Sequence, residues 1–375
     1  TINKLVERAT VGKQHAISQI YDLVVSGNTV MLNLLLRANP RYIASAPYAP
    51  PFLREQSIKA RQVGLLSNEA AYLRTLPCIG GYIGADVVAD VLASGMAEEE
   101  GPSMLIDVGT NAEVVLKWSG KMLTTSCAAG PAFEGGELSS GMRAVEGAIE
   151  EVMIDPKDFS VYYRTIEGIA PRGICGSGLV DSLAWMLLNG IVEKSGRMVA
   201  KDGARCVGVA DGESALILAR DEKRRPITVT QGDVRKGQLA KAAIYVGCET
   251  LIRKAGIAFS ILAKIYLAGA FANYINPVSG MAIGMFPDVE LTLFENVGNG
   301  SAAGSRMVLL SKEADVEAKR IAGQLQAIDM NLEKDFQERF VSATLFPHRD
   351  ETLFRNVSQE IRRRGGIRPL PSELR

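Results

Sequence analysis

The segment that decides the fold is MLIDVGTNAEVVLKWSGKMLTTS, residues 104–126. It starts with an apolar strand, residues 104–108, that carries Asp107, and it continues through a polar turn. A second strand, residues 113–118, turns at Ser119 and Gly120 into a third. We therefore predict a strand that ends in a carboxylate, then a tight glycine turn and a return hairpin.

The pattern of strand, glycine turn and helix recurs along the chain. Residues 22–25 form a strand before a Gly-Asn turn and a helix that ends before Pro40, and a second glycine-rich turn enters a helix at Asp86. A later strand leads to a long helix with Thr230 as N-cap and Asp233 in its first turn. Residues 265–277 and 297–311 repeat the pattern, so the sequence predicts a layered α/β fold.

Composition excludes several classes of protein. The chain has 375 residues, enough for two or three domains, and its 42 basic and 42 acidic residues give no field for nucleic acid or an anionic membrane. No apolar run reaches the roughly 20 residues of a membrane span, so we expect a cytoplasmic protein without membrane attachment. The chain starts without Met, and we expect Thr1 to begin a fragment of a longer protein.

Cysteine and histidine usage argues against metal ligation by these residue types. The five cysteines are far apart in sequence, without C-x-x-C spacing, and are interpreted as buried structural thiols. Only two histidines occur, His15 and His348, which argues against a histidine-ligated metal or a Ser-His triad. Any catalysis must therefore use other groups.

Three glycine turns carry the candidate chemistry. Asp107, with Gly109, Thr110 and Asn111 in the following turn, could hold Mg²⁺ through water and cradle phosphates, although a plain β-turn explains the same string. Gly176, Ser177 and Gly178 precede an apolar helix and could bind an anion there, with helix capping by Ser177 as the alternative. Asp181 is interpreted as a first-turn residue that complements the helix dipole, with a second metal-side carboxylate as the alternative.

The third turn runs from Ala268 to Asn273 and suits a nucleoside lying against bare backbone. Close packing at a strand–helix junction explains it equally well. The sequence has no P-loop and no dinucleotide fingerprint, and the order of three separated glycine turns with one aspartate-bearing loop matches a two-lobed phosphate clamp.

Read together, these segments resemble the C-terminal ASKHA-type region of the reductive activators of corrinoid-dependent enzymes. The resemblance runs from about residue 21 to residue 310. Its motifs are SGNTVM (26–31), GGYIGADVVAD (80–90), LIDVGTNAEVVL (105–116), AAGPAFEGG (128–136), ICGSGLVD (174–181), DVRKGQLAKAAI (233–244), LAGAFANYINP (267–277) and VGN (297–299), with GMRA and GAIE between the fourth and fifth.

The resemblance implies a two-lobed core of the actin, Hsp70 and sugar-kinase type, with mixed sheets flanked by helices. It implies a small N-terminal α/β part over residues 1–100, the nucleotide-binding core over 101–310 and a helical segment with a flexible tail over 311–375. It also implies that ATP, with Mg²⁺, drives an electron from an iron–sulfur domain onto a Co(II) corrinoid to give Co(I).

The four closely spaced cysteines of the family's N-terminal [2Fe-2S] domain are not in this sequence. Either this domain was removed or the protein lacks electron transfer, and the missing start favours removal. The implied partner is a corrinoid protein or a corrinoid-dependent methyltransferase, and a homodimer stays open. Two other functions stay open as well: a small-molecule kinase of the same fold, or a non-catalytic module that binds corrinoid proteins.

Site roles follow from matching residues. Asp107 is assigned to Mg²⁺ and water, Gly109, Thr110 and Asn111 to phosphate contacts, and Glu134 to water orientation, with a structural role as the alternative. Gly176, Ser177 and Gly178 form the second phosphate-side turn, and Gly269 and Asn273 the nucleoside side. Which turn meets the γ-phosphate stays open.

Overall fold

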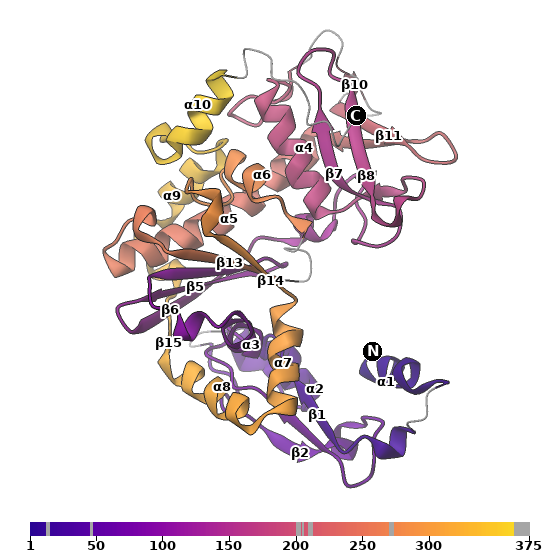
Figure 1. The fold of residues 1–375 in the computed structure, drawn as a ribbon, viewed down its shortest axis with the longest axis vertical. Coiled ribbons are helices and arrows are strands. Elements are labelled where there is room, and N and C mark those ends of the chain that lie inside the picture. Colours follow the sequence, from indigo (N-terminus) through magenta and orange to yellow (C-terminus); the bar gives the residue numbers. More distant parts are fainter. Residues whose placement is uncertain are drawn as a thin grey trace. The chain divides into compact units, whose positions relative to one another are not determined.

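The computed structural model describes residues 1–12, 16–45, 48–199, 204, 206–208, 213–269 and 274–363. The chain folds into two compact units, each assembled from separated parts of the sequence (Figure 1). Unit 1 consists of Thr1–Leu105, Val115–Thr125 and Asn299–Ile328. Unit 2 consists of Ile106–Val114, Ser126–Gly298 and Asp329–Arg375.

In the part of unit 1 that the structure describes, a small three-stranded sheet lies with five α-helices. Strand β1 (Asp22–Val25) pairs in parallel with β3 (Tyr72–Thr75), which pairs in antiparallel with β2 (Ser57–Lys59). Along β3, Leu73 and Thr75 are buried whereas Tyr72 is exposed, the period-two pattern of a strand with one face on a core. The helices are α1 (Ile2–Thr10), α2 (Thr29–Leu35), α3 (Ala85–Ser94), α7 (Gly300–Leu310) and α8 (Lys312–Gln324).

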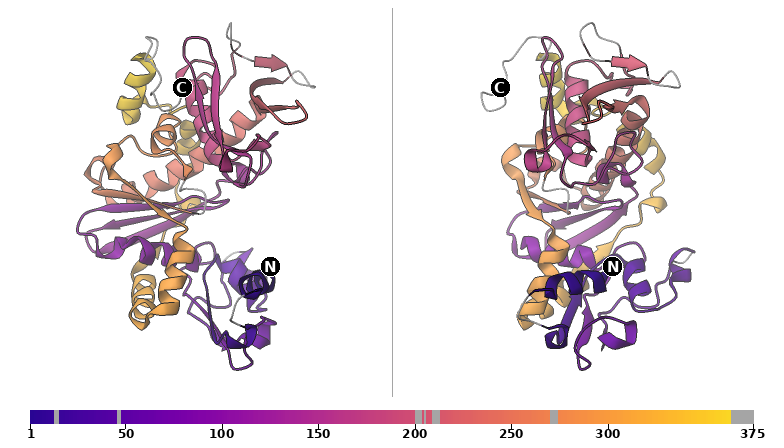
Figure 2. Two further views of the ribbon diagram at one scale, coloured as in Figure 1. Left: turned by 45° about the vertical axis from the view of Figure 1, so that its right-hand side comes forward. Right: turned by 90° about the vertical axis from the view of Figure 1, so that its right-hand side faces the viewer.

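Helices α7 and α8 belong to unit 1 although they come late in the sequence: α3 ends at Ser94, and α7 begins only at Gly300. Both views of Figure 2 show these orange helices against the indigo and purple N-terminal elements. Helix α7 packs so closely on α3 that a Cβ added to Gly304 would lie 2.2 Å from the Ala89 carbonyl oxygen. Ser26 Oγ also forms 2.7 Å hydrogen bonds with Ser301 Oγ and Ser305 Oγ.

The decisive segment forms the middle of a six-stranded sheet with the order β14-β13-β4-β5-β6-β15. Ser119 and Gly120 join β5 to β6 with φ values of 49° and 75°, as a two-residue hairpin turn requires. Side chains of β4 and β5 are almost all buried, which is typical of strands covered on both faces. The strands are β4 (Ser103–Asp107), β5 (Ala112–Trp118), β6 (Lys121–Cys127), β13 (Lys264–Ala268), β14 (Phe294–Gly298) and β15 (Leu325–Ala327).

The described residues of unit 2 add two three-stranded sheets and five α-helices. One sheet has the order β8-β7-β9, with β8 antiparallel and β9 parallel to β7, and the other has the antiparallel order β10-β11-β12. The strands are β7 (Ala148–Ile154), β8 (Val161–Thr165), β9 (Gly173–Ile174), β10 (Cys206–Gly208), β11 (Ser214–Arg220) and β12 (Pro226–Thr230). The helices are α4 (Gly176–Leu188), α5 (Gln231–Ala255), α6 (Pro277–Ala282), α9 (Phe336–Thr344) and α10 (Arg355–Arg363).

The predicted start of the long helix α5 is confirmed in detail. Thr230 Oγ1 accepts the Asp233 N–H at 3.2 Å, and the Asp233 carboxylate accepts the Thr230 N–H at 3.0 Å. This reciprocal capping box satisfies two of the four N–H groups that a helix start leaves without partners. Asp233 also accepts the Ser139 N–H at 3.0 Å, so the same carboxylate fixes a neighbouring loop.

The start of one helix differs from the prediction, beside shifts of one residue at the ends of β4 and β5. Helix α4 starts at Gly176, with Cys175 as N-cap and without a side-chain cap, so capping by Ser177 is wrong. Asp181 consequently lies in the second turn, not the first, and is 6% exposed. The error arose because two glycines within three residues are typical of a turn, whereas packing against β7 here keeps them helical.

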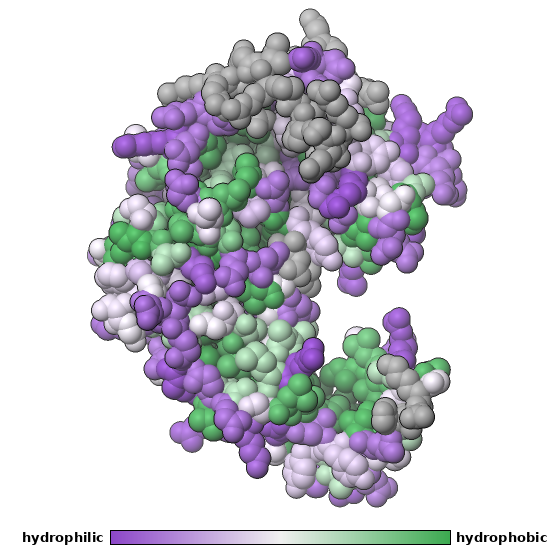
Figure 3. Space-filling view, viewed as in Figure 1, coloured by the Kyte–Doolittle hydropathy of each residue, from purple (hydrophilic) through white to green (hydrophobic). Residues whose placement is uncertain are grey.

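The described surface mixes polar and apolar residues. Figure 3 shows hydrophilic residues spread over the face that it draws, with apolar residues between them. In unit 1, α2 leaves Met31 and Leu34 exposed at 61% and 60%. No helix within the described ranges is both long and apolar enough to span a bilayer.

Candidate functional site

The carboxyl end of β4 meets the end of β13 at Asp107. The Val108 N–H donates to the Ala268 carbonyl at 3.0 Å, and the Gly269 N–H donates to the Gly298 carbonyl at 3.0 Å. Three strand ends are thus tied together by backbone hydrogen bonds. Because parallel strands present their carboxyl ends at one edge, this is where open α/β sheets bind ligands.

Gly269 brings bare backbone against the Asp107 carboxylate. Its φ of +109° lies outside the range that L-residues adopt readily, and an added Cβ would lie 2.6 Å from Asp107 Oδ1. The same Cβ would lie 2.7 Å from the Val108 carbonyl oxygen. Glycine is therefore required at this position both by its backbone angle and by space.

Thr110 and Glu134 are joined by two hydrogen bonds. Glu134 Oε1 accepts the Thr110 N–H and the Thr110 Oγ1–H, each at 2.7 Å. The Thr110 carbonyl oxygen in turn accepts the Gly130 N–H at 2.8 Å. Both side chains are exposed, so the contact lies at the surface of unit 2.

The backbone of Pro131–Glu134, a short 3₁₀ helix, positions Glu134. Phe133 is fully buried, and the 3₁₀ helix packs against α4 and α5. Gly135 follows with φ +74°, and a Cβ there would lie 2.0 Å from the Met142 carbonyl oxygen. A buried anchor on one side of Glu134 and an obligatory glycine on the other fix its backbone while leaving the side chain at the surface.

The turn at Gly176–Gly178 has a different setting. All three residues are buried, and Ser177 is 1% exposed. A Cβ on Gly178 would lie 2.4 Å from the Ile149 carbonyl oxygen, so close packing against β7 already requires this glycine. The phosphate role of this turn stays a prediction.

The structure thus brings together some of the predicted residues. Asp107 lies against Gly269, and Gly109 lies near Glu134, since a Cβ on Gly109 would be 3.7 Å from Glu134 Oε1. Asn111 is exposed at the same turn. Asn273 and His15 lie outside the described residues.

The residue types at this strand edge fit a phosphate ligand with Mg²⁺. A carboxylate at a strand end, a turn with N–H groups and a glycine without a side chain are suited to a water-bridged cation and its phosphates. Among the described residues no group of three or more His, Cys, Asp or Glu side chains could hold a metal ion directly. Asp107 would therefore share the cation with water and phosphate oxygens.

Sequence reasoning missed two backbone partners of the site. Gly298 accepts the Gly269 N–H, and Gly130 donates to the Thr110 carbonyl. Both have positive φ, 78° in each case, and both lie in motifs quoted above for other reasons. Glycines in strand–turn contexts indicate that the backbone there is closely packed. They do not indicate the hydrogen-bond partners, which lie far away in sequence and are brought together only by the fold.

The fold and the strand-edge site define the chain as a member of the ASKHA class, to which actin, Hsp70 and sugar kinases belong. Two family descriptions match. Residues 1–99 match the RACo middle region, and residues 101–358 match the C-terminal domain of RACo, the ASKHA domain. The chain therefore belongs to the RACo family, and the predicted fold and family are confirmed.

Individual relatives agree with this assignment. The corrinoid activation enzyme RamQ of Eubacterium limosum is 34% identical over 337 residues, covering 87% of this chain and 56% of RamQ. A [Co(II) methylated amine-specific corrinoid protein] reductase of Methanosarcina barkeri is 28% identical over 342 residues, covering 83% of this chain and 59% of the reductase.

A solved structure is similar over nearly the whole chain. The reductive activator for corrinoid, iron-sulfur protein superposes with a TM-score of 0.89 at 35% identity, covering 95% of this chain and 57% of that one. The chain thus spans a little over half the length of the relatives that it matches.

Proposed function

We propose that this chain is the ATP-dependent part of a reductive activator, which returns a Co(II) corrinoid protein to Co(I). The observation that carries the proposal is the strand-edge site of Asp107 and Gly269 within a RACo-family chain. One electron passes to cobalt in this reaction, and its donor is an iron–sulfur centre, [2Fe-2S], outside this chain. ATP acts by shifting the population of two conformations.

Each residue has a role in this proposal. Asp107 orients Mg²⁺ and its water, while Gly109, Thr110 and Asn111 contact phosphate oxygens. Gly176, Ser177 and Gly178 support the second phosphate side, Gly269 and Asn273 the nucleoside, and Glu134 the attacking water. Bound Mg²⁺ would neutralise charge that develops on the phosphates.

The proposal includes the setting of the protein. The partner is a corrinoid protein, alone or within a corrinoid-dependent methyltransferase system, and the compartment is the cytoplasm. Self-association into a homodimer and the division of the chain near residues 100 and 310 stay predictions.

The test is ATP hydrolysis with Mg²⁺, measured with and without a Co(II) corrinoid protein, for the wild type and Asp107→Asn. We expect slow turnover that the corrinoid protein stimulates. Loss of the carboxylate charge should reduce stimulated turnover about 100-fold, as for other single electrostatic groups in active sites. Glu146→Gln is the matched control, because it removes an exposed carboxylate of the same unit.

Other outcomes separate the alternatives. A phosphorylated small molecule formed in equal amount to ADP would identify a kinase instead. Neither binding nor hydrolysis of ATP, with the corrinoid protein still bound, would leave a non-catalytic binding module.

A further inference from the structure

In the structure, the hydrogen-bond donors of Thr110 already have an anionic acceptor, which is the side chain of Glu134. One carboxylate oxygen, Glu134 Oε1, accepts both the backbone N–H and the side-chain O–H of Thr110 at 2.7 Å. Two donors from one residue converging on one anionic oxygen is the arrangement with which such a turn would bind a phosphate oxygen.

A carboxylate and a phosphate cannot use these donors at the same time. Each donor hydrogen points to one acceptor, and a phosphate oxygen placed there would meet Glu134 Oε1 at less than a hydrogen-bond length. Both groups are anionic, so their repulsion adds to the steric conflict. Occupation by Glu134 and occupation by phosphate are therefore competing states.

Exchange between these states requires only side-chain rotation. The backbone around Glu134 is fixed by buried Phe133 and by Gly135, and the Thr110 carbonyl is held by the Gly130 N–H. The Glu134 side chain itself is exposed and can turn into water at little cost. The turn keeps its shape while its occupant changes.

We propose that Glu134 occupies the phosphate position of the Thr110 turn in the nucleotide-free protein, and that a nucleotide phosphate displaces it. This inference rests on the proposed function, because it assigns the competitor of ATP at the same site. Glu134 keeps the donors satisfied between turnovers and lowers the apparent affinity for nucleotide by the fraction of molecules in which it is bound.

The experiment is calorimetric titration of MgATP and MgADP into the wild type, Glu134→Gln, Glu134→Ala and the control Glu146→Gln. If Glu134 holds the turn in about nine molecules of ten, Glu134→Ala should bind MgATP about tenfold more tightly. Glu134→Gln keeps an acceptor oxygen without the charge, so its affinity for MgATP should lie between those of the wild type and Glu134→Ala. The control should bind as the wild type does, since Glu146 is exposed elsewhere in the unit.

A second measurement needs no nucleotide. Amide hydrogen exchange at Thr110 in the nucleotide-free wild type should be slower than in Glu134→Ala, because the N–H loses its acceptor in the variant. Thermal unfolding of each variant confirms that the fold is intact.

The outcomes separate this inference from the proposed function. If the wild type binds MgATP and Glu134→Ala binds it equally or more weakly, a phosphate does not displace Glu134. Glu134 would then be a positioning residue for Thr110. Equal Thr110 exchange in the two proteins would overturn the contact itself. Binding by none of the four proteins would overturn the proposed function and this inference with it.

Discussion

Asp181 is a carboxyl group in the buried interior of unit 2. It lies within α4 among buried neighbours, and its Oδ1 has no hydrogen-bond partner in the described structure. Burial raises the pKa of Asp181 from 3.8 to about 7, although the Ser279 side chain and the Val152 N–H partly offset it. The folded protein therefore holds a proton here that the unfolded chain releases at lower pH.

This difference gives a signed prediction for stability against pH. Since the folded-state pKa is raised, the contribution of Asp181 is fully present below about pH 4 and is lost as the pH rises through about 7. The loss is at most about 4 kcal/mol, because a pKa difference of one corresponds to about 1.4 kcal/mol. Asp181→Asn stays neutral and should not lose this contribution.

Urea unfolding of both proteins at about pH 4.5, 6 and 7.5 measures the effect. These values cover the range between the pKa of Asp181 in the unfolded chain and its pKa in the folded protein. The free energy of unfolding of the wild type should fall relative to that of Asp181→Asn as the pH rises. Parallel curves for the two proteins would show that Asp181 is ionised and hydrated in the folded state.

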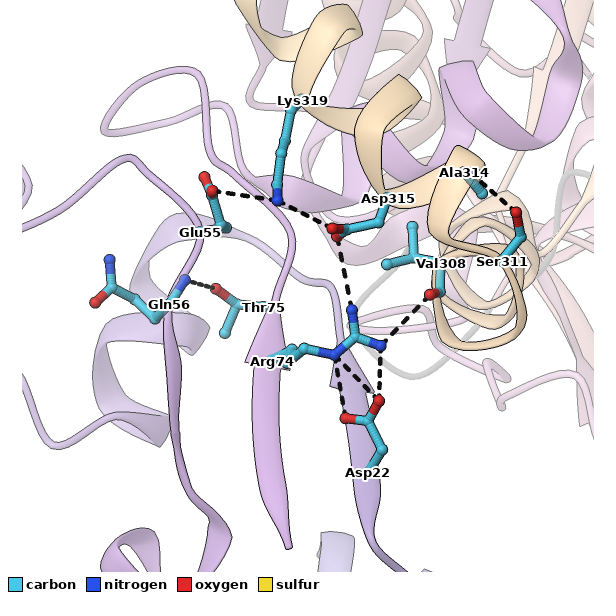
Figure 4. Close-up of polar contacts among 10 residues, drawn as sticks. All are labelled: Asp22, Glu55, Gln56, Arg74, Thr75, Val308, Ser311, Ala314, Asp315 and Lys319. Atoms are coloured by element: carbon cyan, nitrogen blue, oxygen red, sulfur yellow. Dashed lines mark hydrogen bonds and ion pairs between the residues drawn. The ribbon is translucent and has the colours of Figure 1, made fainter.

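At the scale of elements, one arginine joins the small sheet of unit 1 to two helices that return late in the sequence. Figure 4 shows Arg74 of β3 contacting Asp22 of β1, with Nη2 2.7 Å from Oδ2. Arg74 also contacts both helices in Figure 4: its Nη1 lies 3.7 Å from Asp315 Oδ1 of α8, and its Nη2 lies 3.5 Å from the Val308 carbonyl oxygen of α7. Asp315 also pairs with Lys319 at 2.9 Å.

Because Arg74 contacts three elements, β1, α7 and α8, its removal should lower the free energy of unfolding by more than the loss of one surface ion pair does. We expect Arg74→Met to lower the free energy of unfolding by about 1–2 kcal/mol, against at most about 1 kcal/mol for an ordinary exposed pair. Arg74→Lys keeps the charge but not the fork that binds both carboxylate oxygens of Asp22, and it should recover only part of the loss.

Urea unfolding at low and high salt checks this prediction, with Arg197→Met as the control, because Arg197 forms one exposed ion pair, with Glu193, at 2.7 Å. The Arg74→Met effect should shrink in 1 M salt, where charges are screened within about 3 Å. An equal urea midpoint for the wild type and Arg74→Met would mean that the contacts of Arg74 add nothing measurable to the packing of α7 and α8.

At the scale of the whole molecule, the chain leaves and re-enters each unit. Unit 1 needs residues from three stretches, and the last begins at Asn299. This last stretch is needed because α7 packs on the N-terminal part. Gly304 contacts Ala89, and Ser301 and Ser305 form hydrogen bonds with Ser26. The N-terminal 99 residues therefore lack two of the helices that cover α3.

We predict that residues 1–99 expressed alone do not form a cooperative fold, since the face of α3 that meets α7 and α8 would be exposed to water. Poor amide dispersion in NMR and rapid proteolysis are the expected observations. A sharp unfolding transition of this fragment would show instead that α7 and α8 are added to a unit that folds by itself.

The sequence by itself determined the local elements and their class. An apolar run with a carboxylate before a glycine turn predicted β4, its turn and its hairpin, and Thr230 with Asp233 predicted the start of α5. These are short-range effects of backbone sterics, capping and burial, which depend on neighbours within a few residues. The motif order then indicated the family.

Only the tertiary structure decided which of these elements meet. No local rule joins Thr110 to Glu134, Gly269 to Gly298 or α7 to α3, because such contacts depend on packing between segments far apart in sequence. The same dependence explains the error at α4, where β7 and the buried surroundings keep Gly176–Gly178 helical and place Asp181 in the interior. Burial and long-range pairing are properties of the folded chain, and the sequence expresses them only through the fold.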